Sequence, residues 1–320
     1  MNLGPTTTAP VFAAQPYSGI ATFGRCPIAS DPHGYDVSIV GIPYDGSVSY
    51  RSGTRFGPRA IREQSLLLWG YNNAQAIAPF KTLKVADLGD IDVVPPDIVA
   101  THREIERAAT GIVAAGTTLI SLGGDHSISL PLLRAHAKKH GPLAVIHFDA
   151  HPDTWDSEYP GQRYSHGTPF RRAIEESLLD TSAYVQIGIR GPTNGPEDYL
   201  DAINLGARMF TQDECQRGGI EAVLNEVRSR IGTRATYVTL DIDAVDPAFA
   251  PGTGTPEVGG FSSYEILRLV RGLRGLNLVG FDLVEVSPPF DSANITAILA
   301  SNLVFEFLSL VALAKAESVS

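Results

Sequence analysis

The stretch LAVIHFDAHPDTWD (143–156) joins an apolar run to a row of polar side chains, with Asp149, His151 and Asp153 at every second position. A short, continuous apolar run is typical of a strand that is covered on both faces, as in a parallel sheet. Residues two apart in a strand point to the same face, so Asp149 and His151 are expected together. Asp153 joins them if the extended conformation continues. The stretch predicts a core strand that delivers three ligand-type side chains to one place.

Similar apolar runs recur along the chain, and segments with helical periodicity separate them. Strands are expected at 37–44, 83–90, 117–124, 143–151, 184–190, 235–243 and 276–286. Helices are expected at 102–116, 129–141, 220–232 and 262–275. Ser129 is a suitable N-cap for the second of these helices, and Gly141 is a suitable stop. Such regular alternation predicts an α/β fold in which helices cover both faces of a parallel sheet.

Residues 1–35 lack periodicity and are rich in Pro, Thr, Gly and Ala, so they are expected to form an N-terminal arm. Residues 36–320 contain no linker-like segment and no internal repeat, and are expected to form a single domain. The net charge of −10 argues against a nucleic-acid-binding surface, which needs a basic patch. Only two cysteines are present, Cys26 and Cys215, which favours a reducing compartment.

The termini and apolar runs predict a soluble, cytoplasmic protein without a membrane partner. The N-terminus has neither a secretory-signal pattern nor the Arg-rich composition of a transit peptide. No apolar stretch was expected to reach the roughly 18 residues of a membrane span. The longest candidate, LVFEFLSLVALA (303–314), is interrupted by Glu306.

Polar clusters follow the expected strands at their carboxyl ends, which is where sheets of this kind bind ligands. The clusters are SLGGDHS (121–127), HFDAHPD (147–153), TLDIDAVDP (239–247) and LVEVSPP (283–289). They supply six candidate metal ligands: His126, Asp149, His151, Asp153, Asp241 and Asp243. The last cluster adds Glu285. So many carboxylates in one place would repel each other unless a cation lay among them.

Two imidazoles and four carboxylates are too many ligands for one zinc ion and include no thiolate, which favours two Mn²⁺-like ions. Two ions about 3.5–4 Å apart lower the pKa of a shared water from 15.7 towards about 7, which makes it a nucleophile. Each motif alone also has a structural interpretation. The aspartates suit caps and turns, and His126 suits a hydrogen-bonded core position. Their joint placement at strand ends favours the metal site.

Together the motifs resemble those of the ureohydrolases, the arginase/agmatinase family. The resemblance runs from about residue 37 to about residue 310 and rests on GGDHS, HFDAHPD, SHG (165–167), LDIDAVDPAFAPGTGTPEVGG (240–260) and DLVEVSPPFD (282–291). The last two runs and SYRSGTRFGPRAIRE (49–63) are most similar to the agmatinase and guanidino-acid hydrolase branch, especially its guanidinobutyrase-type members.

The resemblance implies a three-layer α/β/α fold with an eight-stranded, mostly parallel sheet, for which ARMFT (207–211) is the candidate eighth strand. It also implies a trimeric or hexameric homo-oligomer and two Mn²⁺ ions, with Asp149 and Asp241 bridging. One ion would be held by His126, Asp149, Asp153 and Asp241, and the other by His151, Asp149, Asp241 and Asp243. His166 resembles the family's proton-shuttling histidine, and Glu285 resembles the glutamate that binds the guanidinium group.

Other side chains receive two interpretations each. His147 shares strand parity with Asp149 and is either a support for the metal ligands or a packed core histidine. Asp125 and Asp246 either orient ligands or accept hydrogen bonds from backbone amides. Five residues are candidates for reading the substrate tail or for ordinary packing: Trp155, Glu158, Arg163, Tyr164 and Arg190. His136 and His140, four residues apart on a helix, are expected at the surface.

The expected activity is hydrolysis of a small guanidino compound to urea and an amine. The substrate is expected to be an ω-guanidino acid such as guanidinobutyrate, or agmatine. An alternative is a nickel-dependent hydrolase of guanidine or a small alkylguanidine or biguanide, since ligand types alone do not separate Mn²⁺ from Ni²⁺. An alternative of another class is a non-catalytic partner subunit, because a fold does not fix a function.

Overall fold

The computed structural model describes residues 15–319, which contain one parallel sheet of eight strands in the order β2-β1-β3-β8-β7-β4-β5-β6. The strands are β1 Val37–Ile42, β2 Val85–Asp90, β3 Thr118–Gly123, β4 Leu143–Phe148, β5 Leu179–Ile189, β6 Arg208–Thr211, β7 Thr236–Asp241 and β8 Leu278–Val284. The predicted α/β fold is confirmed, and the segment at 207–211 supplies the eighth strand, β6, at one edge of the sheet.

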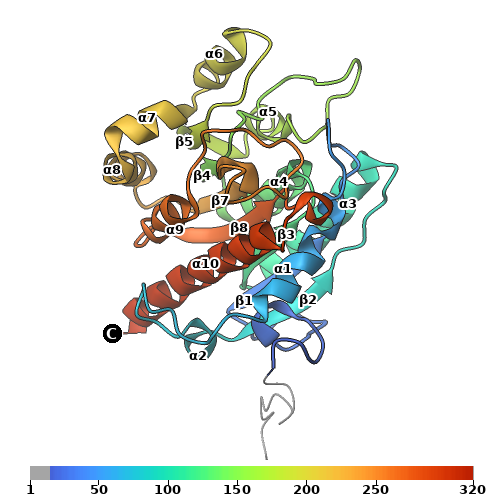
Figure 1. The fold of residues 1–320 in the computed structure, drawn as a ribbon, viewed down its shortest axis with the longest axis vertical. Helices are drawn as coiled ribbons and strands as arrows, with labels where there is room; N and C mark the ends of the chain where they lie inside the picture. Colours follow the sequence, from blue (N-terminus) through green and yellow to red (C-terminus); the bar gives the residue numbers. More distant parts are fainter. Residues whose placement is uncertain (1–14, 320) are drawn as a thin grey trace, which may run out of the picture.

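Helices cover both faces of this sheet (Figure 1). One layer consists of α3 Ile98–Ala114, α4 Ser129–His140 and α5 Pro169–Glu175. The opposite layer consists of α1 Gly57–Ser65, α8 Ile220–Ile231, α9 Ser263–Arg271 and α10 Ile295–Val319. Shorter elements are α2 Pro79–Thr82, α6 Glu197–Asn204, α7 Gln212–Gly218, and the 3-10 turns η1 Phe23–Arg25, η2 Thr54–Phe56, η3 His126–Ile128, η4 Ile242–Ala244 and η5 Pro288–Phe290.

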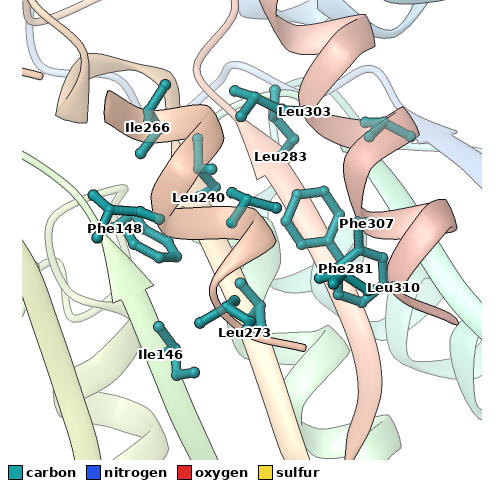
Figure 2. Packing of buried hydrophobic residues seen from close by; sticks show 14 of the residues in the cluster. Ile146, Phe148, Leu240, Ile266, Leu273, Phe281, Leu283, Leu303, Phe307 and Leu310 are labelled. Atoms are coloured by element: carbon teal, nitrogen blue, oxygen red, sulfur yellow. The ribbon is translucent and has the colours of Figure 1, made fainter. Parts of the chain in front are cut away.

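Alternation along the strands explains why the two layers share one sheet. On β4, Ile146 and Phe148 face the cluster formed with α8, α9 and α10, whereas Val145 faces the cluster formed with α3 and α4. Figure 2 shows Phe281 of β8 against Phe307 of α10, and their ring centroids are 4.4 Å apart. Truncating a buried aromatic side chain to alanine typically costs about 3–5 kcal/mol. The packed faces therefore fix the strands that position the polar clusters.

Helix α10 corrects one expectation from the sequence. Its Ile295–Ser318 segment contains an 18-residue window with a mean hydropathy of 2.0 and is, by length and composition, apolar enough to cross a membrane, so the expectation that no stretch reaches that length was wrong. However, 78% of its most apolar window is buried inside the fold. Glu306 lies within the helix and accepts hydrogen bonds from Asn72, Gln75 and Arg271. The segment is a core helix whose buried carboxylate, that of Glu306, is paired.

Part of the predicted N-terminal arm packs on this core. Phe23 is fully buried, and its amide donates to the Asp87 carboxylate at 2.9 Å. Ile28 forms a parallel bridge with the same residue of β2. Residues 1–14 of the predicted arm lie outside the described residues.

Helix α4 differs from expectation at two side chains. His136 is fully buried rather than at the surface, because Gly280 on β8 leaves room for its ring. The ring lies edge-on to Tyr237 at 4.8 Å, and its Nδ1 donates to the Leu132 carbonyl. Ser129 does not cap the helix, because the turn η3 runs directly into it and Ile128 occupies the cap position. Its hydroxyl instead donates to Asp282 at 2.9 Å.

Candidate metal centre

Four central strands bring the polar clusters together. The strands β3, β8, β7 and β4 are neighbours in the sheet, although β3 and β4 are consecutive in the sequence. Inserting β8 and β7 between them opens a crevice at their carboxyl ends, which is the ligand-binding position of such sheets. His126 follows β3, Glu285 follows β8, Asp241 ends β7, and Asp149 follows β4.

His126 lies at the centre of one group of carboxylates. Its Nδ1 is 3.1 Å from Asp149 Oδ2, 2.9 Å from Asp153 Oδ2 and 3.4 Å from Asp241 Oδ2. Burial lowers the pKa of His126, but its close contacts with these three carboxylates outweigh burial and raise it well above its usual value. One imidazole nitrogen therefore faces three carboxylate oxygens, an arrangement that suits a divalent cation.

A second group forms around His151. Its Nδ1 is 3.1 Å from Asp243 Oδ2 and 3.5 Å from Asp149 Oδ1. Asp149 thus presents Oδ2 to the His126 group and Oδ1 to the His151 group. A carboxylate shared in this way is suited to bridge two ions.

The electrostatics of the centre favour bound cations. Burial, together with the charges of Asp243 and Asp149, raises the pKa of Asp241 well above its usual value. Burial and the charge of Asp149 raise the pKa of Asp153 to about 7. Four carboxylates and two imidazoles within one buried crevice match the donor set of Mn²⁺-like ions, so the residues fit a binuclear centre.

Local turns, rather than an extended strand, deliver several of these side chains. Strand β4 ends at Phe148, and Asp153 reaches the centre with a φ of 48°, in the left-handed region. Extended backbone was the condition under which Asp153 would join the other two residues, and it does not continue to Asp153, although the side chains do converge. Asp243 lies in the turn η4, and its amide donates to Asp241 Oδ1 at 2.8 Å. Short polar side chains tolerate and stabilise such turns.

His147 supports the bridging carboxylate. Its Nε2 is 2.6 Å from Asp149 Oδ2, and its Nδ1 is 3.1 Å from the Tyr184 hydroxyl. The ring is also packed against Phe170, with centroids 4.1 Å apart. Both interpretations of this residue thus describe its surroundings, and burial lowers its pKa to about 4.

Glu285 and His166 form a pair beside the His126 group. Glu285 has a φ of 64°, and its Oε1 accepts from the His126 amide at 2.9 Å and lies 3.1 Å from His166 Nδ1. Its Oε2 is buried without a hydrogen-bond partner among residues 15–319. That free oxygen is available to a cationic ligand.

Opposite influences act on the His166 ring. Burial lowers its pKa, but the hydrogen bond and charge of Glu285, with the charges of Glu158 and Asp153, raise it to about 10. At the other nitrogen, the Ser49 amide points at Nε2 at 3.0 Å, and the Ser49 hydroxyl lies 2.8 Å away. An amide donor requires an unprotonated Nε2, so it opposes the carboxylates. The net effect is a raised pKa of His166, because the carboxylates of Glu285, Glu158 and Asp153 surround the ring.

Ser49 was missed as a site residue, whereas Glu158 was a candidate for reading the substrate tail and contacts the loop that carries His166. Glu158 accepts from the Ser165 hydroxyl and from the Gly167 amide, which flank His166 in the chain. Ser49 lies in a loop without periodicity, so spacing gives no signal for it. Ser49 lies in the run 49–63, from which only the branch of the family was predicted.

Asp125 and Asp246 serve backbone and hydroxyl donors. Asp125 accepts from the amides and hydroxyls of Ser47 and Ser127, and so ties the loop after β1 to the start of η3. Asp246 accepts from three backbone amides in its own loop region, those of Ala248, Gly259 and Gly260.

The other four candidates for the substrate tail have different surroundings. Arg190 donates to backbone carbonyls, including those of Asp243 and Glu257, so its guanidinium group is already engaged. Arg163 is 60% exposed and pairs with Glu175. Trp155 Nε1 is buried without a partner in the described chain. Tyr164 lines a cavity of about 310 Å³ with Tyr44, Ser47, Val48 and Tyr159, beside the loop that carries Ser49.

The chain is similar to known proteins over a range that includes all of the candidate site residues. A family model described as "Arginase family" matches residues 35–309. The chain is 47% identical over 302 residues to guanidinopropionase of Pseudomonas aeruginosa, covering 94% of this chain and 95% of that protein. It is 45% identical over 300 residues to human guanidino acid hydrolase, mitochondrial, covering 94% and 85%. The solved structure of proclavaminate amidino hydrolase from Streptomyces clavuligerus matches with a TM-score of 0.90 and 45% identity, covering 93% and 99%.

Proposed function

From the premise that this chain belongs to the arginase family, we propose that it is an amidinohydrolase that cleaves a small guanidino compound to urea and an amine. The observation that carries the proposal is the position of Asp149. Its two oxygens face His126 and His151 in turn, within a crevice that also holds three further carboxylates. Such a donor set is suited to two ions and to hydrolysis.

We propose that one ion is held by His126, Asp149, Asp153 and Asp241, and the other by His151, Asp149, Asp241 and Asp243. Two divalent ions, when bound, lower the pKa of a water molecule and so supply a nucleophile at neutral pH. Mn²⁺ is the proposed metal because carboxylates predominate in the donor set, and Ni²⁺ is the alternative.

Glu285 and His166 are proposed to bind and protonate the substrate. The unpartnered Oε2 of Glu285 can accept charge-assisted hydrogen bonds from a planar guanidinium cation. The amine that leaves needs a proton, because an unprotonated amine is a poor leaving group. His166, whose pKa is raised, can hold that proton at Nδ1 beside Glu285 and deliver it.

The proposed substrate is an ω-guanidino acid, with agmatine as the alternative. Two relatives are named for guanidino acids, guanidinopropionase and guanidino acid hydrolase. Trp155 and Tyr164 remain the candidates for contact with the tail, and Arg163 could do so only by leaving Glu175. Arg190 is dropped from the proposal, because backbone carbonyls occupy its donors.

We further propose that residues 36–320 act as a single catalytic domain in a trimeric or hexameric homo-oligomer, and that the protein works in the cytoplasm. The family resemblance supports the assembly. The acidic net charge of −10 supports a protein without a nucleic-acid partner.

The test is urea release from a panel of guanidino compounds, run separately with Mn²⁺ and with Ni²⁺. The panel holds guanidinobutyrate, guanidinopropionate, agmatine, arginine and free guanidine. We expect the highest kcat/KM with an ω-guanidino acid and Mn²⁺. A preference for free guanidine with Ni²⁺ would support the alternative metal and substrate. No urea from any compound, by protein that binds both metals, would favour a non-catalytic subunit.

A further inference from the structure

The ring of His126 has partners on two opposite sides. Nδ1 faces the carboxylates of the metal centre, whereas Nε2 lies 2.8 Å from Thr239 Oγ1. A neutral imidazole carries one N–H and one lone pair. Nδ1 can therefore bind a cation only when the proton is on Nε2, and the partner of Nε2 decides whether that tautomer is favoured.

Thr239 is linked in turn to a buried carboxylate. Its Oγ1 lies 2.6 Å from Asp282 Oδ1, and the two residues are direct partners in the register of β7 and β8. A hydroxyl has a single proton, and a carboxylate can only accept. Thr239 therefore donates to Asp282 and uses its oxygen lone pair to accept from His126 Nε2–H. This direction leaves the lone pair of Nδ1 free.

Asp282 is held by two more hydroxyls. Its Oδ2 accepts from Tyr237 Oη at 2.7 Å and from Ser129 Oγ at 2.9 Å. Burial raises the pKa of Asp282, and its hydroxyl donors oppose this effect. Among the described residues, the groups within hydrogen-bond distance of the Asp282 carboxyl group are three hydroxyls, each of which can donate its proton to an ionised carboxylate.

The chain of contacts is sealed from solvent. All five residues of the chain are completely buried: Ser129, Tyr237, Thr239, Asp282 and His126. Water therefore cannot replace a missing link, and removing one leaves a buried polar group unpaired.

We propose that Thr239 and Asp282 are positioning residues that hold His126 in the tautomer able to bind a metal ion. The inference rests on the proposed function, because it needs His126 to be a ligand. Partners of this kind fix the tautomer and raise the basicity of a ligating histidine, and their loss typically costs about 10–100-fold in metal affinity.

The experiment is calorimetric titration of Mn²⁺ into metal-stripped protein. Thr239→Val keeps the side-chain shape but removes the hydroxyl, and we expect roughly 10–100-fold weaker binding. Thr239→Ser restores the hydroxyl and should recover most of the affinity. Asp282→Asn removes the charge and should weaken binding too. His126, Thr239 and Asp282 act in one chain of hydrogen bonds. The variant that carries both Thr239→Val and Asp282→Asn should therefore lose no more Mn²⁺ affinity than the single variant with the larger loss.

Thr236→Val is the matched control. Thr236 is buried on the same strand, but its hydroxyl donates to the Arg234 carbonyl at 2.8 Å and has no link to His126. Wild-type affinity is expected for this variant, and thermal unfolding of each metal-free protein checks that it is folded. If Thr239→Val does not fold, Thr239→Ser and Asp282→Asn decide the matter.

Wild-type affinity in both Thr239→Val and Asp282→Asn would overturn the inference, as would an equal loss in Thr236→Val. These results leave the proposed function intact if the wild type binds two ions and releases urea. Failure of the wild type itself to bind Mn²⁺ or Ni²⁺ would instead refute both.

Discussion

Glu285 and His166 are a single pair of residues with complementary roles. Glu285 uses Oε1 for the protein and leaves Oε2 free, and the same Oε1 holds His166 Nδ1. A cation bound at Oε2 would therefore lie close to His166, the proposed proton donor to the leaving amine. In the proposed mechanism, the pair would couple substrate binding to proton delivery through one carboxylate.

His166→Asn is expected to lower kcat/KM by about 10²–10⁴-fold and to remove the basic limb of its pH profile. In the proposed mechanism the protonated ring of His166 is the active form, and its fraction falls as pH rises through its pKa. Because the nearby carboxylates raise the pKa of His166, the limb should lie above pH 6.5 in the wild type. His33→Asn, which changes an exposed histidine, is the control. An unchanged basic limb in His166→Asn would exclude this role.

For individual residues, the sequence predicted which side chains converge at the site but not their backbone conformations. Strand periodicity predicted that the side chains of Asp149 and His151 lie together, and Asp149 Oδ1 is 3.5 Å from His151 Nδ1. It could not predict that Asp153 and Glu285 adopt positive φ, because these conformations depend on tertiary contacts. Ser49 was missed because its contact with His166 joins residues 117 positions apart in irregular segments.

Among the elements, α4 and α10 each bury a polar group inside an apolar layer. His136 of α4 packs over Gly280 and Tyr237, and Glu306 of α10 accepts from three donors. Sequence periodicity predicted the start, end and type of α4 but placed His136 at the surface. The glycine that makes room for the ring is 144 positions away in sequence, so no local pattern reveals it.

His136→Leu is expected to reduce the loss of stability in acid. Burial lowers the pKa of His136 to about 4, below the unfolded value of 6.5, so the unfolded chain takes up a proton first as pH falls. This contribution is present above pH 6.5 and is lost between 6.5 and 4, at about 1.36 kcal/mol per unit. Urea unfolding of metal-free protein at pH 7 and pH 5 should show a difference smaller by roughly 2 kcal/mol in the variant.

The surface histidine on the same helix provides the control for that measurement. His140→Gln changes a mostly exposed side chain and should leave the pH dependence close to that of the wild type. The same pH dependence in His136→Leu and in the wild type would mean that His136 is not held neutral in the fold.

Glu306→Ala is expected to lower the free energy of unfolding by roughly 2 kcal/mol, less than the 3–5 kcal/mol of a fully buried pair. The discount arises because the side chain of Arg271, its ionic partner, is 28% exposed. Glu317→Ala is the matched control on α10, since Glu317 and Arg274 are 54% and 56% exposed, and it should change stability by under about 0.5 kcal/mol. Equal effects in urea unfolding would show that the buried network adds nothing.

For the whole molecule, the strand order decides where chemistry is possible. Consecutive strands β3 and β4 are separated by β8 and β7, and each of the four contributes polar groups at its carboxyl end. The alternation of strands and helices predicted the parallel sheet and its covering layers (Figure 1). It did not give the strand order, which long-range packing determines, as in the contact between Phe281 and Phe307.

The most direct test of a binuclear centre is urea release from the best guanidino substrate as Mn²⁺ is added stepwise to metal-free protein. Bound metal per chain is measured in the same samples. Because Asp149 faces both ligand groups, activity should rise until two ions are bound per chain, and Asp149→Asn should bind less metal and release little urea. Full activity with one ion or none, or unchanged metal binding and activity in Asp149→Asn, would contradict the account.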